Sequence, residues 1–191
     1  MSRLRRPIAV LAVLLASGGL TACGKHHDES ARIQHIEGEG FYLSLGDLKY
    51  QVQISRQLNP DDIQDRSYLL GVPAAERQLK PDEVWFGVFL QVENEAAEPQ
   101  PPSGEIEILD TQEEVFKPIA LDDTNLFAYR STELIPPGRI VPLEDTPAFD
   151  SPIRGSLLLF KLKLTALDNR PLELKIEGTT TPQTGIIDLD V

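Results

Sequence analysis

Apolar and polar residues alternate along four long runs of the chain, at residues 48–58, 83–94, 156–164 and 172–177. A period of two residues is typical of a β-strand that buries one face. We therefore predict four strands. Their inward rows are Tyr50, Val52 and Ile54; Val84, Phe86, Val88, Leu90 and Val92; Leu158, Phe160, Leu162 and Leu164; and Leu172, Leu174 and Ile176.

Shorter apolar runs and turn-forming residues separate these strands. We predict further short strands at 105–109, 115–116 and 186–189, and one short helix around Asp61 to Tyr68, after the Asn59-Pro60 step. Asp168 to Pro171 lies between two alternating runs and predicts a hairpin loop. Fifteen prolines also suit many short strands, so the pattern indicates an all-β sandwich or barrel.

The first 23 residues follow another pattern. Basic Arg3, Arg5 and Arg6 precede the unbroken apolar run Ile8 to Leu15, as in a secretory signal peptide. A membrane-spanning helix needs about 20 apolar residues, so this run is too short to be one. The following Leu20-Thr21-Ala22-Cys23 resembles the lipobox of bacterial lipoproteins.

In that family the cysteine receives a diacylglyceryl group, and the signal peptide is removed just before it. The resemblance implies that Cys23 is the lipidation site and that the protein is held in the membrane by its lipid. The alternatives are a secreted protein with a chance cysteine and an uncleaved anchor. Gly24 carries no inner-membrane retention signal, so we expect an outward-facing lipoprotein of the cell membrane, or of the outer membrane in a diderm.

This organisation predicts a signal peptide at 1–22, a flexible tether at 23–40 and a single β-sandwich domain at 41–191. The chain has a formal net charge of −12, and loss of 1–22 leaves 15 Lys+Arg against 30 Asp+Glu, or −15. Such a charge argues against nucleic acid as a partner and suits a basic envelope protein or a polymer. Cys23 is the only cysteine, so no intramolecular disulfide is possible.

Candidate catalytic residues are scarce. All three histidines, His26, His27 and His35, fall in the predicted tether, which leaves the domain without a Ser-His-Asp or Cys-His arrangement. Mobile histidines also make poor metal ligands, so we predict no catalytic residue, cofactor or metal. The acidic groups Asp61-Asp62-Asp65, Asp122-Asp123 and Glu144-Asp145 could hold Ca²⁺ or hydrolyse glycosides, but solvation and helix capping explain them better.

Trp85 and Phe89 form a possible interaction surface. They flank Gly87 on the face opposite the inward row of their strand. Exposed, they would make an aromatic stripe for a peptide or glycan. The alternative, which we favour, is that loops such as Asn125 to Tyr129 cover this face.

The stretch from Val84 to Ile176 resembles the telokin-like, immunoglobulin-like domains of bacterial envelope lipoproteins. The matching pieces, in order, are Val84 to Asn94 followed by Glu95 to Pro99, Ile108-Leu109-Asp110, Leu134-Ile135-Pro136-Pro137-Gly138, and Gly155 to Phe160. In that family the Asn helps to close a turn, and the Pro-Gly step introduces a strand that returns to the sheet. The chain departs from the pattern with Gln112 in place of a Gly and with a proline-rich loop at 99–102.

The resemblance implies an immunoglobulin-like antiparallel β-sandwich in the envelope, without an activity. Two functions remain after these arguments. The first is a non-catalytic, lipid-anchored protein that binds a protein or an envelope polymer. The second is an envelope hydrolase that uses loop carboxylates.

Overall fold

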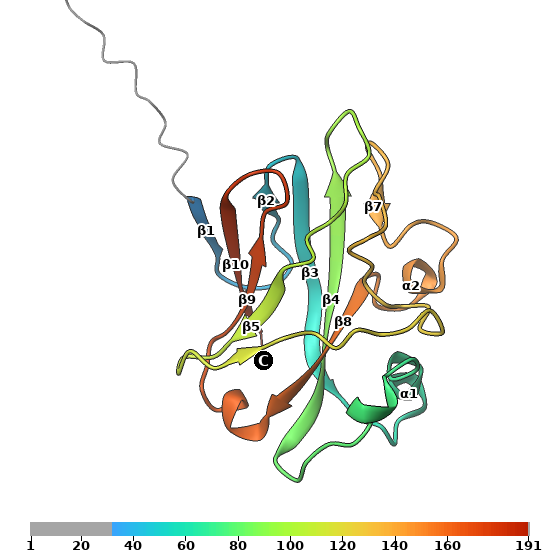
Figure 1. Cartoon of the computed structure of the whole chain (residues 1–191), viewed down its shortest axis with the longest axis vertical. Coiled ribbons are helices and arrows are strands. Elements are labelled where there is room, and N and C mark those ends of the chain that lie inside the picture. Colours follow the sequence, from blue (N-terminus) through green and yellow to red (C-terminus); the bar gives the residue numbers. More distant parts are fainter. Residues whose placement is uncertain (1–31, 191) are drawn as a thin grey trace, which may run out of the picture.

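A computed structural model describes residues 32–190, which form a β-sandwich of two sheets (Figure 1). One sheet has the order β1 (Arg32–Ile36), β10 (Gln183–Leu189), β9 (Leu172–Glu177), β5 (Ile106–Leu109) and β6 (Val115–Phe116). The other has β2 (Leu43–Leu45), β3 (Leu48–Leu58), β4 (Glu83–Asn94) and β7 (Ile140–Val141), with β8 (Ser156–Lys163) also paired to β4. The predicted all-β sandwich is confirmed.

Helices are few and short in the described part of the chain. They are α1 (Ile63–Tyr68) and α2 (Pro147–Asp150), with 3-10 turns at Ala74–Glu76 and Leu164–Leu167. The predicted helix near residue 61 therefore begins two residues later. None of these helices has the length and apolar character needed to cross a membrane.

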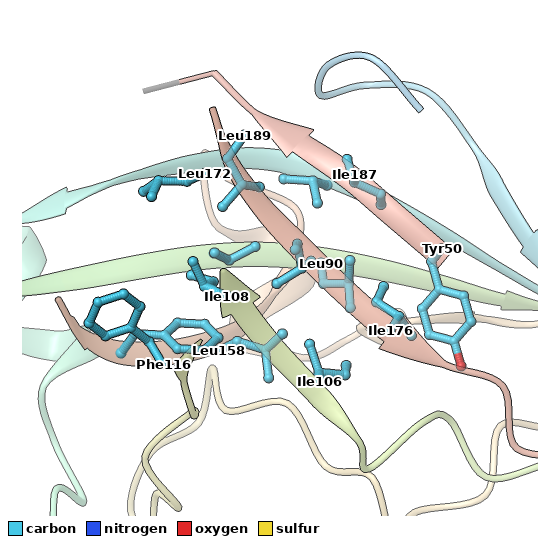
Figure 2. Packing of buried hydrophobic residues seen from close by; sticks show 14 of the residues in the cluster. Tyr50, Leu90, Ile106, Ile108, Phe116, Leu158, Leu172, Ile176, Ile187 and Leu189 are labelled. Atoms are coloured by element: carbon cyan, nitrogen blue, oxygen red, sulfur yellow. The ribbon is translucent and has the colours of Figure 1, made fainter. Parts of the chain in front are cut away.

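The main core lies between the two sheets, and Figure 2 shows part of it. Side chains from β3, β4 and β8 meet those of β5, β9 and β10 there, because each strand turns alternate residues toward the other sheet. The predicted inward rows are found in this core for β4, β9 and most of β8. Its fully covered members include Tyr50, Phe86, Leu90, Phe160, Leu174 and Ile187.

A second apolar cluster covers the opposite face of the β3-β4-β8 sheet. Trp85 and Phe89 are 4% and 0% exposed, so the interpretation of these residues as an exposed interaction stripe is wrong. Tyr68 of α1 makes an edge-to-face contact with Phe89, and Phe127 contacts Tyr68 in the same manner. The alternative, in which the loop at 125–129 helps to cover this face, is confirmed.

One inward row changes face partway along β3. Val52 pairs with Leu90, but Ile54 pairs with Phe89, so Gln53 is an extra residue opposite one step of β4. Such a β-bulge reverses the facing of the residues beyond it. The prediction that Ile54 faces the main core with Tyr50 is therefore wrong, and Ile54 packs against the second cluster.

The end of β8 also differs from the prediction. Leu164 begins a 3-10 turn instead of continuing the strand, and it is 46% exposed. The following segment at 168–171 is not a hairpin loop, because β8 pairs with β4 in one sheet and β9 pairs with β5 and β10 in the other. The chain crosses between the sheets here, which local alternation does not reveal.

The predicted tether is also wrong in its second half. Residues 32–36 form β1, which pairs in parallel with β10, and Ile36 packs against the main core. Further along, the Glu39 carboxylate accepts hydrogen bonds from the backbone N–H groups of Ser55 and Asp190, at 3.1 and 3.2 Å. The folded domain thus begins by Arg32. The predicted signal peptide, Cys23, His26 and His27 lie outside the described residues.

Two features expected from the family resemblance are present at the end of β4. The Asn94 side-chain amide donates hydrogen bonds to the carbonyls of Glu98 and Ile135, at 2.9 and 2.8 Å. Its oxygen accepts one from the N–H of Ala96 at 2.9 Å, which closes the turn. The Gly138 N–H donates to the Asn94 carbonyl at 2.8 Å, and β7 follows directly.

An ion pair joins α1 to β3 and makes stability dependent on pH. The Asp62 side chain caps α1, and the buried Asp65 carboxylate accepts hydrogen bonds from the Arg56 guanidinium and from the Asn59 N–H. The hydrogen bonds from Arg56 lower the pKa of Asp65 below its ordinary value of 3.8. A carboxylate with a lowered folded-state pKa stabilises the fold above its unfolded pKa, and this contribution is lost as the pH falls through the folded pKa.

We expect Asp65→Asn to lower the free energy of unfolding by about 1.5–3 kcal/mol at neutral pH, because charge-assisted hydrogen bonds are lost. The difference from the wild type should shrink as the pH falls from 3.8, the ordinary carboxyl value, through the lower pKa of Asp65 in the folded protein, because the wild-type carboxylate is then protonated too. Urea unfolding at a series of pH values would measure it. A difference that stays constant down to pH values well below 3.8 would contradict this account.

Candidate binding site

Two pockets lie on either side of residues 128–130 and share Ala128, Tyr129 and Arg130 as a common wall. The first has a volume of about 310 Å³ and is also lined by Leu126, Leu134, Val141, Leu143, Thr146 and Ser156. The second has a volume of about 330 Å³ and is also lined by Ser103, Ile106, Ile119, Thr132 and Leu158. We call them the first and second pockets.

The first pocket forms where the partner of β4 changes. One edge of β4 pairs with β8 along Glu83 to Leu90 and then with β7 at Val92 and Glu93. The chain between β7 and β8, which contains α2, leaves the sheet at this point. Val141 at the end of β7 and Ser156 at the start of β8 therefore line the pocket.

The common wall is held against β8 by its backbone. The Tyr129 N–H donates to the Leu157 carbonyl at 2.9 Å, and the Leu157 N–H donates to the Phe127 carbonyl at 2.7 Å. These bonds make a short parallel bridge between Ala128 and Leu157. The wall is thus an extension of the sheet.

The hydroxyl of Tyr129 is directed away from solvent. It donates to the Ser103 carbonyl at 2.7 Å, while the Ser103 N–H donates to the Tyr50 hydroxyl at 2.9 Å. Burial raises the pKa of Tyr50 to about 12 and that of Tyr129 well above its ordinary value of 10. Both phenols are therefore neutral at physiological pH and fix the Pro-rich segment between β4 and β5.

Arg130 serves the structure of the neighbouring loop. Its guanidinium donates to the carbonyls of Leu121, Asp122 and Asn125, at 2.6, 2.7 and 3.3 Å. With its donors used in this way, it offers little to an incoming anion. The remaining charged side chains of the first pocket are Asp123 and Glu133, both exposed. Asp123 Oδ1 lies 3.7 Å from Arg130 Nη2, whereas Glu133 has no ion pair among residues 32–190, so the rim is acidic mainly at Glu133.

The rim also exposes apolar side chains. Leu126 and Leu134 are 63% and 60% exposed and line the first pocket. Ser156 is only 7% exposed, and its hydroxyl has no hydrogen-bond partner among residues 32–190, although it lines the same pocket. The first pocket therefore combines an apolar rim, exposed carboxylates and one unused hydroxyl.

The acidic groups seen in the sequence serve other purposes. Asp62 caps α1, Asp65 pairs with Arg56, Asp122 accepts from Thr124 and Glu144 pairs with Arg139. Within residues 32–190, the only group of three or more histidine, cysteine or carboxylate ligands with close donor atoms is His35, Glu173 and Asp188, on the outer face of the other sheet. The hydrogen bond to Asp188 raises the pKa of His35 above its ordinary value of 6.5.

The pockets were not found from the sequence. They arise from segments around residues 103, 128, 141 and 156, which are separate loops and strand ends along the chain. Leu126 and Leu134 are the one available signal, because each is a leucine beside polar residues in a segment without strand periodicity.

No protein-family model matches the chain, and no curated protein matches it. Solved structures that are similar include an uncharacterized β-sandwich protein from Clostridium difficile 630, with 12% identity and a TM-score of 0.46, covering 87% of this chain and 99% of that chain. The yjhA protein from Bacillus subtilis has 9% identity and a TM-score of 0.49, covering 81% of this chain and 100% of that chain.

Proposed function

We propose that the protein is a lipid-anchored, non-catalytic envelope protein that binds a basic segment of another envelope protein at the first pocket. The lipobox at residues 20–23 supports the anchor, and the formal charge of −15 after removal of residues 1–22 supports a cationic partner. The observation that carries the binding proposal is the first pocket, where Leu126 and Leu134 are exposed beside Asp123 and Glu133.

The chemistry of the rim specifies the kind of segment. When a partner covers the exposed leucines, their apolar surface is removed from water. This burial favours binding by roughly 25 cal/mol per Å². The carboxylates of Asp123 and Glu133 are placed to attract Lys or Arg side chains on the same partner. A segment that alternates apolar and basic residues satisfies both, whereas an acidic segment is repelled.

We expect a peptide of alternating Leu and Lys to bind the protein, and a matched peptide of Leu and Glu to bind much more weakly. Exchanging both rim leucines (Leu126→Ser with Leu134→Ser) should lower the affinity for the Leu-Lys peptide by at least about tenfold, or ~1.4 kcal/mol. Leu164→Ser is the matched control, because Leu164 is exposed but does not line either pocket. Fluorescence anisotropy measures each affinity, and circular dichroism checks folding.

Salt distinguishes this partner from a neutral polymer. Raising the salt concentration from about 0.05 to about 0.5 M should markedly lower the affinity for the Leu-Lys peptide, because salt screens the attraction between the carboxylates and the lysines. The contrary result is a neutral glycan that binds independently of salt and loses this binding in the rim variant. That result would identify the partner as an envelope polymer and not as a basic protein. Equal binding by the rim variant and the wild type would refute the site.

The anchor is tested separately. Cys23→Ala should abolish lipid attachment, because the chain has no other cysteine to accept it. Metabolic labelling with a fatty-acid analogue measures this, and Ser17→Ala, a small-residue exchange within the predicted signal peptide, should keep the label. Lipid label that persists in Cys23→Ala would refute the prediction that Cys23 is the lipidation site.

A further inference from the structure

Three neighbouring strands bring one histidine and two carboxylates together on the outer face of the β1-β10-β9 sheet. Asp188 of β10 lies directly opposite Glu173 of β9. His35 of β1 lies opposite Ile186, two residues before Asp188, so His35 and Asp188 project from the same face. The donor atoms of the three side chains lie within 4.8 Å of one another, and His35 Nε2 is 2.6 Å from Asp188 Oδ1.

This group has more negative charge than its protein neighbours balance. Carboxylates that face each other across an antiparallel pair repel. Lys175, the lysine on the same face of β9, is bound instead to Glu107 and Glu177, at 3.2 and 3.0 Å. The Glu173 carboxylate has no hydrogen bond or ion pair with any residue between 32 and 190.

The donor set is that of a transition-metal site. Imidazole nitrogen with carboxylate oxygens suits Zn²⁺ and its first-row neighbours, whereas Ca²⁺ and Mg²⁺ prefer oxygen alone. Zinc lies about 2.1 Å from such donors, so two donors on one ion are at most ~4.2 Å apart. The three donor atoms, which lie within 4.8 Å of one another, must therefore come closer to share one ion, and the Glu173 side chain is free to move because it has no partner among residues 32–190.

We propose that His35, Asp188 and Glu173 bind one divalent transition-metal ion, with Zn²⁺ as the ion used to test it. The ion neutralises the two carboxylates and joins β1 to β10 and β9. The site is separate from the two pockets, since none of its ligands lines them. The expectation of no metal ligand assumed a mobile His35, and His35 lies instead on a paired strand.

Calorimetric titration of the full-length chain with Zn²⁺, against a competing chelator, tests the site. All samples carry Cys23→Ser to remove the only thiol. We expect one Zn²⁺ to bind and to raise the thermal midpoint. Glu173→Gln and His35→Ala should each lower the affinity for Zn²⁺ by at least about tenfold. Glu173→Gln is the sharper variant, because it leaves the contact between His35 and Asp188 in place and removes no other bond.

The matched control is the double variant His26→Ala with His27→Ala, which removes the other two histidines and should keep the Zn²⁺ affinity. Loss of Zn²⁺ in this control, with unchanged affinity in Glu173→Gln and His35→Ala, would overturn the proposal. So would Ca²⁺ binding at equal affinity, because a site that contains an imidazole nitrogen should favour Zn²⁺ over Ca²⁺. Thermal unfolding without metal confirms that each variant is folded.

Discussion

Phe86→Ala should lower the free energy of unfolding by about 3–5 kcal/mol, the usual range for removing a fully buried phenylalanine. Phe86 is 0% exposed in the main core, and it pairs with Phe160 of β8 across the ladder. The loss combines the favourable free energy of burying the ring, which the variant no longer gains, with the cost of a cavity that two hydrogen-bonded sheets cannot close by moving. Urea unfolding followed by circular dichroism measures the difference.

Phe41→Ala is the control for residue type, because Phe41 is 61% exposed. Its effect should stay within about 0.5 kcal/mol. A loss below about 1 kcal/mol for Phe86→Ala would mean that the strand turns its other face to the main core.

Gly185→Ala should destabilise the protein by about 1–3 kcal/mol, although only one methyl group is added. A Cβ atom at Gly185 of β10 would lie 2.1 Å from Leu43 Cδ2 and 3.0 Å from Leu43 Cγ. Leu43 of β2 is 0% exposed, so its side chain has no free space into which it can turn. The absence of a side chain on Gly185 therefore allows β10 to lie close to β2, the edge strand of the other sheet.

A double-mutant cycle separates this clash from a loss of backbone freedom. Leu43→Ala removes the obstructing atoms, so Gly185→Ala should cost less in that background than in the wild type. Gly104→Ala is the matched single control, because its nearest contact would be Ser131 Oγ at 3.3 Å on an exposed loop. Equal costs of Gly185→Ala in both backgrounds would refute steric overlap with Leu43.

Alternation predicted the long strands and most of their inward faces because burial between sheets acts on every second residue. Phe86, Leu158 and Leu174 lie in the main core for this reason. The pattern failed at Gln53, where one inserted residue turns Ile54 to the other face. It also failed at β1, a short edge strand whose partner lies about 150 residues further along the chain. The residues around β1 in the sequence do not indicate that a strand so far along the chain pairs with it.

The candidate sites could not be read from the sequence for a related reason. Tyr129 and Ser103 meet only after the sheets have formed, and so do His35 and Asp188, which are 153 positions apart. What composition did supply was the sign of the net charge of the chain, from which the basic character of the proposed partner was inferred. The depth of the pockets and the burial of Trp85 depend on how loops fold over the sheet.

The parallel pairing of β1 with β10 has a mechanical consequence. A pull on the chain ahead of Arg32, directed along β1, loads the bonds between the two strands in shear, because those bonds lie across the direction of force. All of them must stretch together before any one breaks. A hairpin pulled apart at its open end instead loses its bonds one after another. The parallel pairing of β1 with β10 therefore makes the start of the domain resistant to tension along the chain.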